Sequence, residues 1–263
     1  MIEYTFISGA TGGIGGAFCS LCAEKGYNLF LTGRSEDKLK ALKERLLRSY
    51  PGISAEYFAC DLTDESSRDH MLGYIDEKGI RFDRIINVAG VDIQKAFMEY
   101  TSEKVLFQIR TNAEATVTLT HALLKRRAEK TEVITISSMS GATPMPYFAL
   151  YSATKSMLIN FFTALHYELK AEGVKVTVVM PGGVPTRPDI IKDIEGQGLW
   201  GKLSSKSPEF VAERSLKAVT KNKIKYIPGF FNKFLYFIMK ILPERLVLKF
   251  IAKRWKKISK DAF

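Results

Sequence analysis

A chain of 263 residues, 46% of them apolar, can form one large domain with a sizeable core and is not a disordered polypeptide. An odd, sparse set of three cysteines is not typical of a disulfide framework, so we expect a reducing, cytoplasmic compartment. The three isolated histidines show no metal-ligand spacing, so we expect no bound metal. The net charge of +11 is concentrated near one end, because twelve Lys or Arg stand against two acidic residues from Lys221 onward.

Short apolar runs and longer helical patterns alternate along the first 180 residues. The runs predict strands, which we place at 4–8, 28–32, 54–59, 84–87, 132–137 and 175–180. The longer patterns predict helices, which we place at 15–25, 36–49, 65–78, 102–128 and 151–172. This order predicts an α/β fold with a doubly wound parallel sheet of the Rossmann type and helices on both faces. Such a sheet binds ligands at the carboxyl ends of its strands.

Two further segments lie outside this alternation. Residues 186–208 are expected to be irregular and to form a lid over the site. Residues 228–263 are expected to be a basic amphipathic helical extension of a single catalytic domain that covers 1–227. The chain starts with a strand-like run in place of a signal peptide, and no uninterrupted apolar stretch reaches about 18 residues, so we expect no membrane-spanning helix.

Glycines crowd the connection between the first predicted strand and the first predicted helix, where residues 8–15 read SGATGGIG. Glycine lets a backbone turn sharply and approach a pyrophosphate closely, and the helix start beyond it offers free N–H groups. The spacing G-x-x-x-G-x-G differs from the G-x-G-x-x-G of the standard dinucleotide fingerprint. The residues that we expect to hold a dinucleotide cofactor here are Gly9, Thr11, Gly13, Ile14 and Gly15.

The end of the second predicted strand selects the cofactor. It reads Gly33-Arg34-Ser35, with no acidic residue to hold a ribose 2′-hydroxyl. Arg34 can pair with a 2′-phosphate and Ser35 can add a hydroxyl donor, which favours NADP (NADPH) over NAD; the alternative for Arg34 is a solvated surface side chain. Asp61, after the third strand, can accept a hydrogen bond from the adenine amino group or cap the next helix, a role for which Asp64 competes.

A tyrosine and a lysine lie four residues apart on a predicted helix, as Tyr151 and Lys155. This spacing puts both side chains on one helix face. A tyrosine with an ordinary pKa of about 10 is a poor acid or base at neutral pH, and a neighbouring ammonium lowers that pKa towards the working range. Ser138, at the end of a predicted strand, can donate to a developing oxyanion. The three side chains together predict an acid/base site.

With these residues the sequence resembles the short-chain dehydrogenase/reductase family in its compact single-domain form. The resemblance covers nearly all of the first 190 residues and rests on Gly9, Gly13, Gly15, Asp61-Leu62, Asn87-Val88-Ala89-Gly90, Asn112, Ile136-Ser137-Ser138, Tyr151, Lys155 and Pro181-Gly182. It implies that Tyr151 exchanges a proton with the substrate oxygen, which Ser138 holds. It also implies that Lys155 lowers the pKa of Tyr151 and binds the nicotinamide ribose.

The resemblance implies further roles around this centre. Asn112 bends its helix around a water that links Lys155 to solvent. Val184 and Thr186 contact the nicotinamide carboxamide. The remaining residues that the resemblance places beside the cofactor are Leu62, Asn87, Ala89, Gly90, Pro181 and Gly182.

Two positions depart from the family pattern. Val88 replaces the second Asn of the usual Asn-Asn-Ala-Gly, and a source of structural hydrogen bonds is lost with it. The glycine loop also lacks the basic residue that many NADP-using members carry, which weakens the preference for NADP slightly. Gly33, by contrast, aligns with the position where NAD-using members carry an acid.

The extension reads PGFFNKFLYFIMKILPERLVLKFIAKRWKK over 228–257 and divides at Pro243. Its two helical segments mix Phe, Ile, Leu and Trp with Lys and Arg. This pattern suits an anionic membrane surface, and equally a subunit contact or a lid over an apolar pocket; nucleic-acid binding is the weakest interpretation. A similar tail in some bacterial and lipid-related members of the family favours a hydrophobic substrate.

These features predict an NADP(H)-dependent oxidoreductase that transfers a hydride between the nicotinamide and an apolar or acyl-like ketone or alcohol. The substrate pocket is expected to lie between 92–97, 139–148 and 186–207. A non-catalytic dinucleotide-binding sensor or scaffold is the alternative, and the intact Tyr151/Lys155 pair argues against it. The resemblance also implies a homodimer or homotetramer, formed through the two longest predicted helices.

Overall fold

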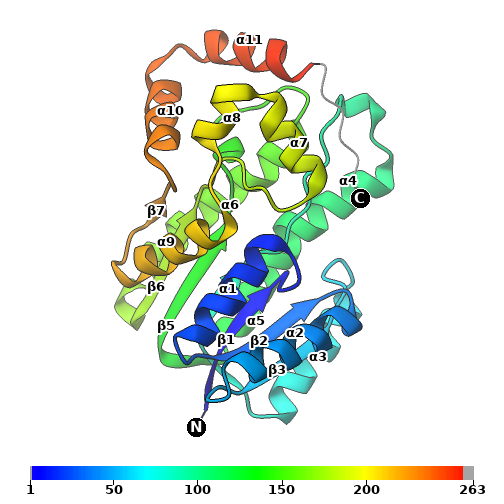
Figure 1. Ribbon diagram of the computed structural model, residues 1–263, viewed down its shortest axis with the longest axis vertical. Coiled ribbons are helices and arrows are strands. Elements are labelled where there is room, and N and C mark those ends of the chain that lie inside the picture. The colour runs from blue at the N-terminus through cyan, green and yellow to red at the C-terminus, as the bar shows by residue number, and fades with distance from the viewer. Residues whose placement is uncertain (1, 257–263) are drawn as a thin grey trace.

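The computed structural model describes residues 2–256; Met1 and residues 257–263, which include the end of the predicted extension, lie outside the described part. Its centre is a seven-stranded parallel sheet in the order β3-β2-β1-β4-β5-β6-β7 (Figure 1). The strands are β1 Glu3–Ser8, β2 Asn28–Gly33, β3 Ala55–Ala59, β4 Arg81–Asn87, β5 Arg127–Ile136, β6 Val174–Val179 and β7 Lys225–Tyr226. The strand order reverses between β1 and β4, which confirms the predicted Rossmann-type sheet and marks the carboxyl ends of this pair as the ligand-binding edge.

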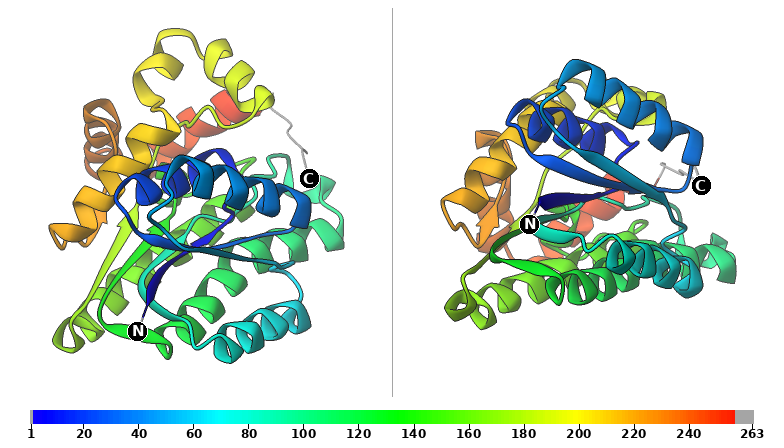
Figure 2. Two further views of the ribbon diagram at one scale, coloured as in Figure 1. Left: turned by 60° about the horizontal axis from the view of Figure 1, so that its bottom comes forward. Right: turned by 90° about the horizontal axis from the view of Figure 1, so that it is seen from below.

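Helices cover both faces of the sheet (Figure 2). One face carries α1 Gly13–Glu24, α2 Glu36–Ser49 and α9 Pro208–Thr220. The other carries α3 Glu65–Glu77, α4 Ser102–Ile109, α5 Ala115–Leu124 and α6 Ala149–Glu168. Alternation along β1 divides the core in two, because Phe6 packs with α3, α5 and α6 while Ile7 packs with α1, α2 and α9.

The predicted single helix over 102–128 is wrong in two respects. A π-helical turn, Arg110–Glu114, separates α4 from α5, and α5 ends at Leu124. Arg126 and Arg127 are good helix formers, but their backbone pairs with β4, where the Phe82 N–H donates to the Arg126 carbonyl at 3.1 Å. Pairing with the neighbouring strand therefore prevails over local propensity.

The expectation of an irregular segment over 186–208 is also wrong. Most of it is helical, as α7 Pro188–Gly196 and α8 Gly198–Ser204. Pro188 occupies the first helical turn of α7, where a missing N–H costs nothing, and Gly198, the first residue of α8, takes a left-handed φ of +59°. The proline and the glycine mark helix ends here rather than a coil.

The C-terminal part forms two helices, α10 Phe230–Ile241 and α11 Glu244–Trp255, separated by Pro243. They run along the outer side of α8 and across the end of the molecule that lies beyond the carboxyl ends of the strands (Figure 1). The buried Asn232 side chain donates to the Ser204 and Pro228 carbonyls, both at 2.9 Å, and so ties α10 to the end of α8. Within residues 2–256, no helix combines the length and the apolar character that crossing a bilayer requires.

Candidate active site

The glycine loop forms a tight turn at the ligand-binding edge. Gly9 has a φ of +63°, and a Cβ on Gly15 would lie 2.1 Å from the Gly9 carbonyl oxygen, so a side chain at either position would force the turn open. The helix α1 begins at Gly13, its N-cap Gly12 makes no side-chain cap, and its first turn carries no acidic residue. These first-turn N–H groups, with the helix dipole behind them, fit the pyrophosphate of a dinucleotide.

The segment after β6 lies against this loop. A Cβ on Gly13 would be only 2.6 Å from Cγ2 of Thr186, and the Thr186 N–H donates to the Val184 carbonyl at 2.8 Å. At the start of the segment, the Pro181 carbonyl accepts a hydrogen bond from the Met139 N–H at 2.9 Å. The structure therefore brings the predicted cofactor residues of this segment to the same edge as the glycine loop.

Close packing at Gly182 requires a glycine in the segment after β6. A Cβ on Gly182 would lie 2.6 Å from the Ser204 carbonyl oxygen and 2.8 Å from the Asn232 amide. Asn232, which we did not predict, thus joins the C-terminal extension to the cofactor edge. Its signal in the sequence is a single amide within a strongly apolar helical run.

The residues at the end of β2 lie close to the glycine loop. A Cβ on Gly33 would be 3.4 Å from the Thr11 hydroxyl. Arg34 is exposed, with its guanidinium 6.0 Å from the centre of the Phe107 ring, so the charge is free to turn towards an anion. The Ser35 hydroxyl caps α2 by accepting from the Lys38 N–H at 3.4 Å, and its own O–H remains a donor.

Asp61 is exposed and does not cap the following helix. Its Oδ1 accepts from the Thr63 N–H at 2.9 Å and from the Thr63 hydroxyl at 2.8 Å, while Asp64 caps α3. The neighbouring Leu62 is buried, and its carbonyl accepts from Arg68 at 2.6 Å. Of the two roles weighed for Asp61, the geometry excludes the cap and leaves its second carboxylate oxygen for a ligand.

Hydrogen bonds hold the end of β4 in place even though Val88 replaces the usual Asn. The Ser8 hydroxyl oxygen accepts from the backbone N–H groups of Val88 and Ala89, at 3.0 and 3.2 Å. Because these bonds use only backbone donors, they do not require Asn at position 88. The Asn87 amide donates to hydroxyls in α5 and β5, namely Thr120 at 2.9 Å and Thr135 at 3.1 Å.

Asn112 lies inside the π-helical turn that separates α4 from α5. Its Oδ1 accepts from the Val91 N–H at 2.7 Å, and its amide donates to the Val91 carbonyl at 2.9 Å and to the Thr154 hydroxyl at 3.2 Å. The side chain is fully buried. The helix therefore departs from α-helical geometry at the residue where a bend was predicted, and π-turns recur at functional sites.

Tyr151, Lys155 and Ser138 meet at the end of β5. Tyr151 and Lys155 lie one turn apart on α6, with the Lys155 Nζ 5.7 Å from the centre of the Tyr151 ring. The Nζ donates to the Ile136 carbonyl at 3.0 Å and borders Gly90. A hydrogen bond joins the side chains of Ser138 and Tyr151.

Burial dominates the electrostatics of this pair. It raises the pKa of Tyr151 well above its usual value, and the Asp92 carboxylate adds to the rise, while the Ser138 hydrogen bond and Arg187 oppose it. Burial also lowers the pKa of Lys155 to about 8, against the opposing effect of Asp92. The net direction for Tyr151 is thus upward rather than the expected downward one. Its phenol keeps its proton at neutral pH, which suits a proton donor.

An ion pair beside Tyr151 links two segments far apart in the sequence. The Arg187 guanidinium lies 2.8 Å from an Asp92 oxygen and 3.1 Å from an Asp189 oxygen. Arg187 immediately precedes α7, so the pair holds the start of this helix against the loop after β4. We predicted Asp92 only as part of the pocket wall. Its partner Arg187 is 95 residues away, so the local sequence around Asp92 gives no sign of the ion pair.

Helix α11 contributes to an apolar wall that packs against Tyr151. The Phe148 ring stacks on Tyr151 with 4.3 Å between ring centroids, and Trp255 follows at 6.4 Å from Phe148. Val247 and Ile251 of α11 join the same buried cluster. For the inward face of α11, these contacts favour a cover over an apolar pocket; they leave the role of the outward face open.

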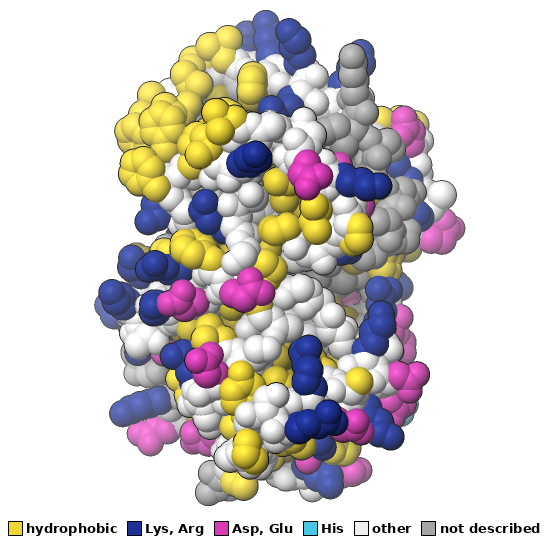
Figure 3. Space-filling view, in the orientation of Figure 1, with side chains coloured by type: hydrophobic (Ala, Val, Ile, Leu, Met, Phe, Trp, Pro, Cys, Tyr) yellow, Lys and Arg dark blue, Asp and Glu magenta, His cyan; other side chains and the backbone are white. Residues whose placement is uncertain are grey.

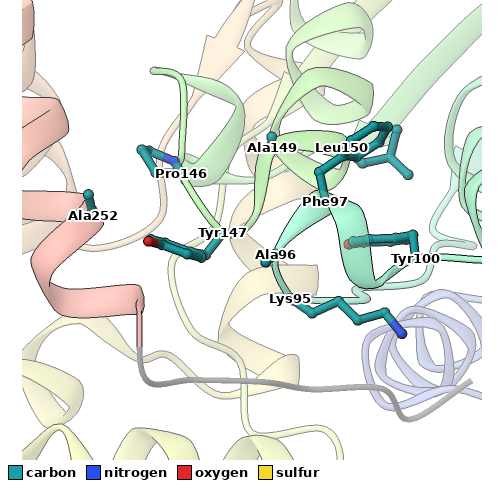
Figure 4. A pocket seen from close by; sticks show the side chains of 9 residues that line it. All are labelled: Lys95, Ala96, Phe97, Tyr100, Pro146, Tyr147, Ala149, Leu150 and Ala252. Carbon is teal, nitrogen blue, oxygen red and sulfur yellow. The ribbon is translucent and has the colours of Figure 1, made fainter.

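A pocket of about 240 Å³ opens next to this wall (Figure 4). Two of the three predicted wall segments contribute to it, whereas α11 supplies Ala252 in place of any residue from 186–207. Tyr147 adopts a φ of +64°, which side chains rarely accept, so a strained residue shapes the pocket. The lining residues are Lys95, Ala96, Phe97, Tyr100, Pro146, Tyr147, Ala149, Leu150 and Ala252.

The family model described as short chain dehydrogenase matches residues 3–192. The sulfoacetaldehyde reductase of Chromohalobacter salexigens is 31% identical over 196 residues, which cover 73% of this chain and 76% of that protein. A very-long-chain 3-oxoacyl-CoA reductase of Neurospora crassa is 31% identical over 67% of this chain, a match that spans only 54% of its own length.

Among solved structures, a 7β-hydroxysteroid dehydrogenase superposes with a TM-score of 0.85 at 24% identity. The match covers 95% of this chain and 96% of that one, so the similarity in fold extends into the C-terminal part.

Proposed function

This chain belongs to the short-chain dehydrogenase/reductase family, and from that premise we propose that it is an NADP(H)-dependent oxidoreductase for an apolar or acyl-like ketone or alcohol. Membership of the family makes it an oxidoreductase that acts on carbonyl or alcohol groups. The observation that carries the finer proposal is the meeting of Tyr151, Ser138 and Lys155 beside the glycine loop.

In the proposed reduction, Tyr151 donates its phenolic proton to the carbonyl oxygen. A nicotinamide cofactor held at this edge would supply the hydride for the carbonyl carbon and would itself become oxidised to NADP⁺. The substrate thereby becomes an alcohol, and Tyr151 is left as a tyrosinate. Ser138 donates a hydrogen bond to the same oxygen and so stabilises the charge that develops on it. Lys155, protonated near neutral pH and close to the Tyr151 ring, stabilises the tyrosinate. Oxidation of an alcohol follows the same steps in reverse.

The residues that would hold the cofactor surround this centre. The first turn of α1 and the glycine loop suit the pyrophosphate, and the free carboxylate oxygen of Asp61 suits the adenine amino group. Thr186, which lies against the glycine loop, and Val184, whose carbonyl accepts from the Thr186 N–H, suit the carboxamide. Arg34 and Ser35 at the end of β2 suit a 2′-phosphate.

Arg34→Ala is expected to weaken NADPH binding by about 10- to 100-fold and to leave NADH binding nearly unchanged, since a charged hydrogen-bonded pair contributes about 1.5–3 kcal/mol. Fluorescence titration of both nucleotides measures the two dissociation constants. Lys40→Ala removes an exposed cation of α2 and is the matched control. Equal losses for both nucleotides, or no loss for NADPH, would mean that Arg34 is a solvated surface residue.

The substrate class is proposed from the wall of Phe148, Val247 and Ile251 beside Tyr151. Such a wall favours a carbonyl group attached to apolar chain. NADPH oxidation should be followed with a chain-length series of ketones and 3-ketoacyl thioesters. Rising kcat/KM with chain length is the expected result, because each buried methylene contributes about 0.8 kcal/mol. Tight NADPH binding without turnover on any member would favour the sensor alternative instead.

We also propose a homodimer or homotetramer built on the outer faces of α4 and α6. Leu106 on α4 and Met157 and Tyr167 on α6 are large exposed side chains that support such a contact. Three free, buried cysteines support the proposal of a reducing, cytoplasmic compartment.

A further inference from the structure

Helix α10 carries an apolar stripe that faces away from the protein. Phe230, Phe234, Phe237 and Ile241 recur at helical spacing, and their exposed fractions are 86%, 51%, 59% and 60%. An amphipathic helix that serves only to complete a domain turns such a stripe inwards. Here the inward contacts are made by other residues, among them the buried Asn232.

Helices α8 and α11 extend the stripe into one surface. Trp200 of α8 meets Phe231 of α10 edge to face at 5.2 Å and lies 6.4 Å from Phe250 of α11, so the three helices are joined through its ring. We call this surface the docking patch, and its exposed apolar residues are Leu199, Trp200, Leu203, Phe230, Phe234, Phe237, Ile241, Leu242, Leu246 and Phe250. Figure 3 shows hydrophobic side chains gathered at the upper left, over α8 and α10, with Lys and Arg beside them. A patch this concentrated marks an interaction site.

The charge around the docking patch restricts its partner. Only one acidic residue, Glu244, occurs on α8, α10 and α11. The exposed basic residues on these helices and just beyond α11 are Lys202, Lys233, Lys240, Arg245, Lys249, Lys253 and Lys256. A second copy docked about a twofold axis would set this basic surface against itself, and juxtaposed like charges oppose association. The fitting partner is therefore both apolar and anionic.

We propose that the docking patch binds the surface of an anionic lipid bilayer, with α10 and α11 lying in the interface. Aromatic and aliphatic side chains enter the boundary between headgroups and acyl chains, while the lysines contact lipid phosphates. Each helix has twelve residues, which suits lying on a membrane and is too short to cross one.

A second face of α11 borders the active site, so attachment to a membrane would bring that site close to the bilayer. Val247 and Ile251 face the cluster with Tyr151, while Leu246 and Phe250 face outwards, so one helix borders both the bilayer and the apolar wall. Access of an apolar substrate from the membrane rests on the proposed function. Attachment itself does not, and it can be measured without turnover.

The test is sedimentation of the full-length chain with vesicles of phosphatidylcholine alone or mixed equally with phosphatidylglycerol. We expect binding to the mixed vesicles only, weakened by salt. Phe234→Ser/Phe237→Ser and Lys233→Gln/Lys240→Gln should each reduce the partition coefficient by about tenfold or more. Both pairs are exposed on α10, and thermal denaturation verifies that the variants fold.

Lys40→Gln/Lys125→Gln removes two exposed charges far from the docking patch and is the matched control, expected to bind like the wild type. Equal losses in the control and the α10 variants, wild-type binding by the phenylalanine variant, or no binding to either vesicle would overturn the proposal. So would a dimer in analytical ultracentrifugation that Phe234→Ser/Phe237→Ser converts to monomer without any effect on vesicle binding, because the patch would then be a subunit contact.

Discussion

Tyr151→Phe is expected to lower kcat for the proposed NADPH-dependent ketone reduction by about 1,000-fold, within the range that general acid catalysis contributes. The change removes the proposed proton donor and little else. The ring that stacks on Phe148 at 4.3 Å is retained, and so is the packing of α6 against the sheet. Stopped-flow or steady-state NADPH oxidation measures kcat, and fluorescence titration should give an NADPH dissociation constant within about twofold of wild type.

Tyr147→Phe is the matched control for this prediction. Tyr147 lines the neighbouring pocket and loses the same hydroxyl in the variant, but neither Ser138 nor Lys155 is its partner in the described contacts. We expect its kcat to stay within a fewfold of wild type, which corresponds to a change of at most about 1 kcal/mol in the activation free energy. If Tyr151→Phe retained a tenth or more of wild-type turnover, another group or water would have to supply the proton.

Local periodicity explains why the proximity of Tyr151 and Lys155 and the position of the glycine loop can be predicted from the sequence. A helix places Tyr151 and Lys155 on one face whatever surrounds them, and a glycine loop between a first strand and a first helix has few alternative uses. The same reasoning fails for α11, because an amphipathic helix with apolar residues on two sides does not reveal which side meets the domain. Val247 and Ile251 turn inwards and Leu246 and Phe250 outwards only because of the long-range packing on Phe148.

Long-range effects also account for the electrostatics that sequence reasoning missed. The Lys155 pattern predicts a lower Tyr151 pKa, but spacing carries no information on burial, which acts in the opposite direction. The Asp92–Arg187 pair depends on two loops that meet only in the folded sheet. The prediction of one helix over 102–128 was wrong for a related reason. Arg127 belongs to β5 because it pairs with β4, a strand that is distant in the sequence.

The buried Lys155 is expected to make stability depend on pH in a distinctive way. Its pKa is about 8 in the folded protein and about 10.4 when unfolded, so between these values the unfolded chain binds a proton that the folded chain does not. The free energy of unfolding therefore gains from this group as pH rises from 8 to 10.4, by up to about 1.4 kcal/mol per pH unit and about 3 kcal/mol in total. Below pH 8 the folded protein bears the whole cost of the buried ammonium.

Lys155→Met isolates this contribution, because it keeps the shape of the side chain and removes its titration. Buried thiols act in the opposite sense above about pH 8.5, since burial raises the pKa of Cys22 to about 12, but they are common to both proteins and cancel in the difference. Urea denaturation at pH 7 to 10 should therefore show the stability of the variant relative to wild type falling by up to about 3 kcal/mol as pH rises.

Lys170→Met, an exposed lysine just beyond α6, should show no such trend. If the difference in unfolding free energy between Lys155→Met and wild type did not change with pH, Lys155 would have an ordinary pKa. Its charge alone would then have to stabilise the proposed tyrosinate, without any effect of burial on its pKa. If the gap closes with pH as expected while the variant lacks turnover, the ammonium beside Tyr151 is kept for catalysis at the expense of stability, as active-site groups commonly are.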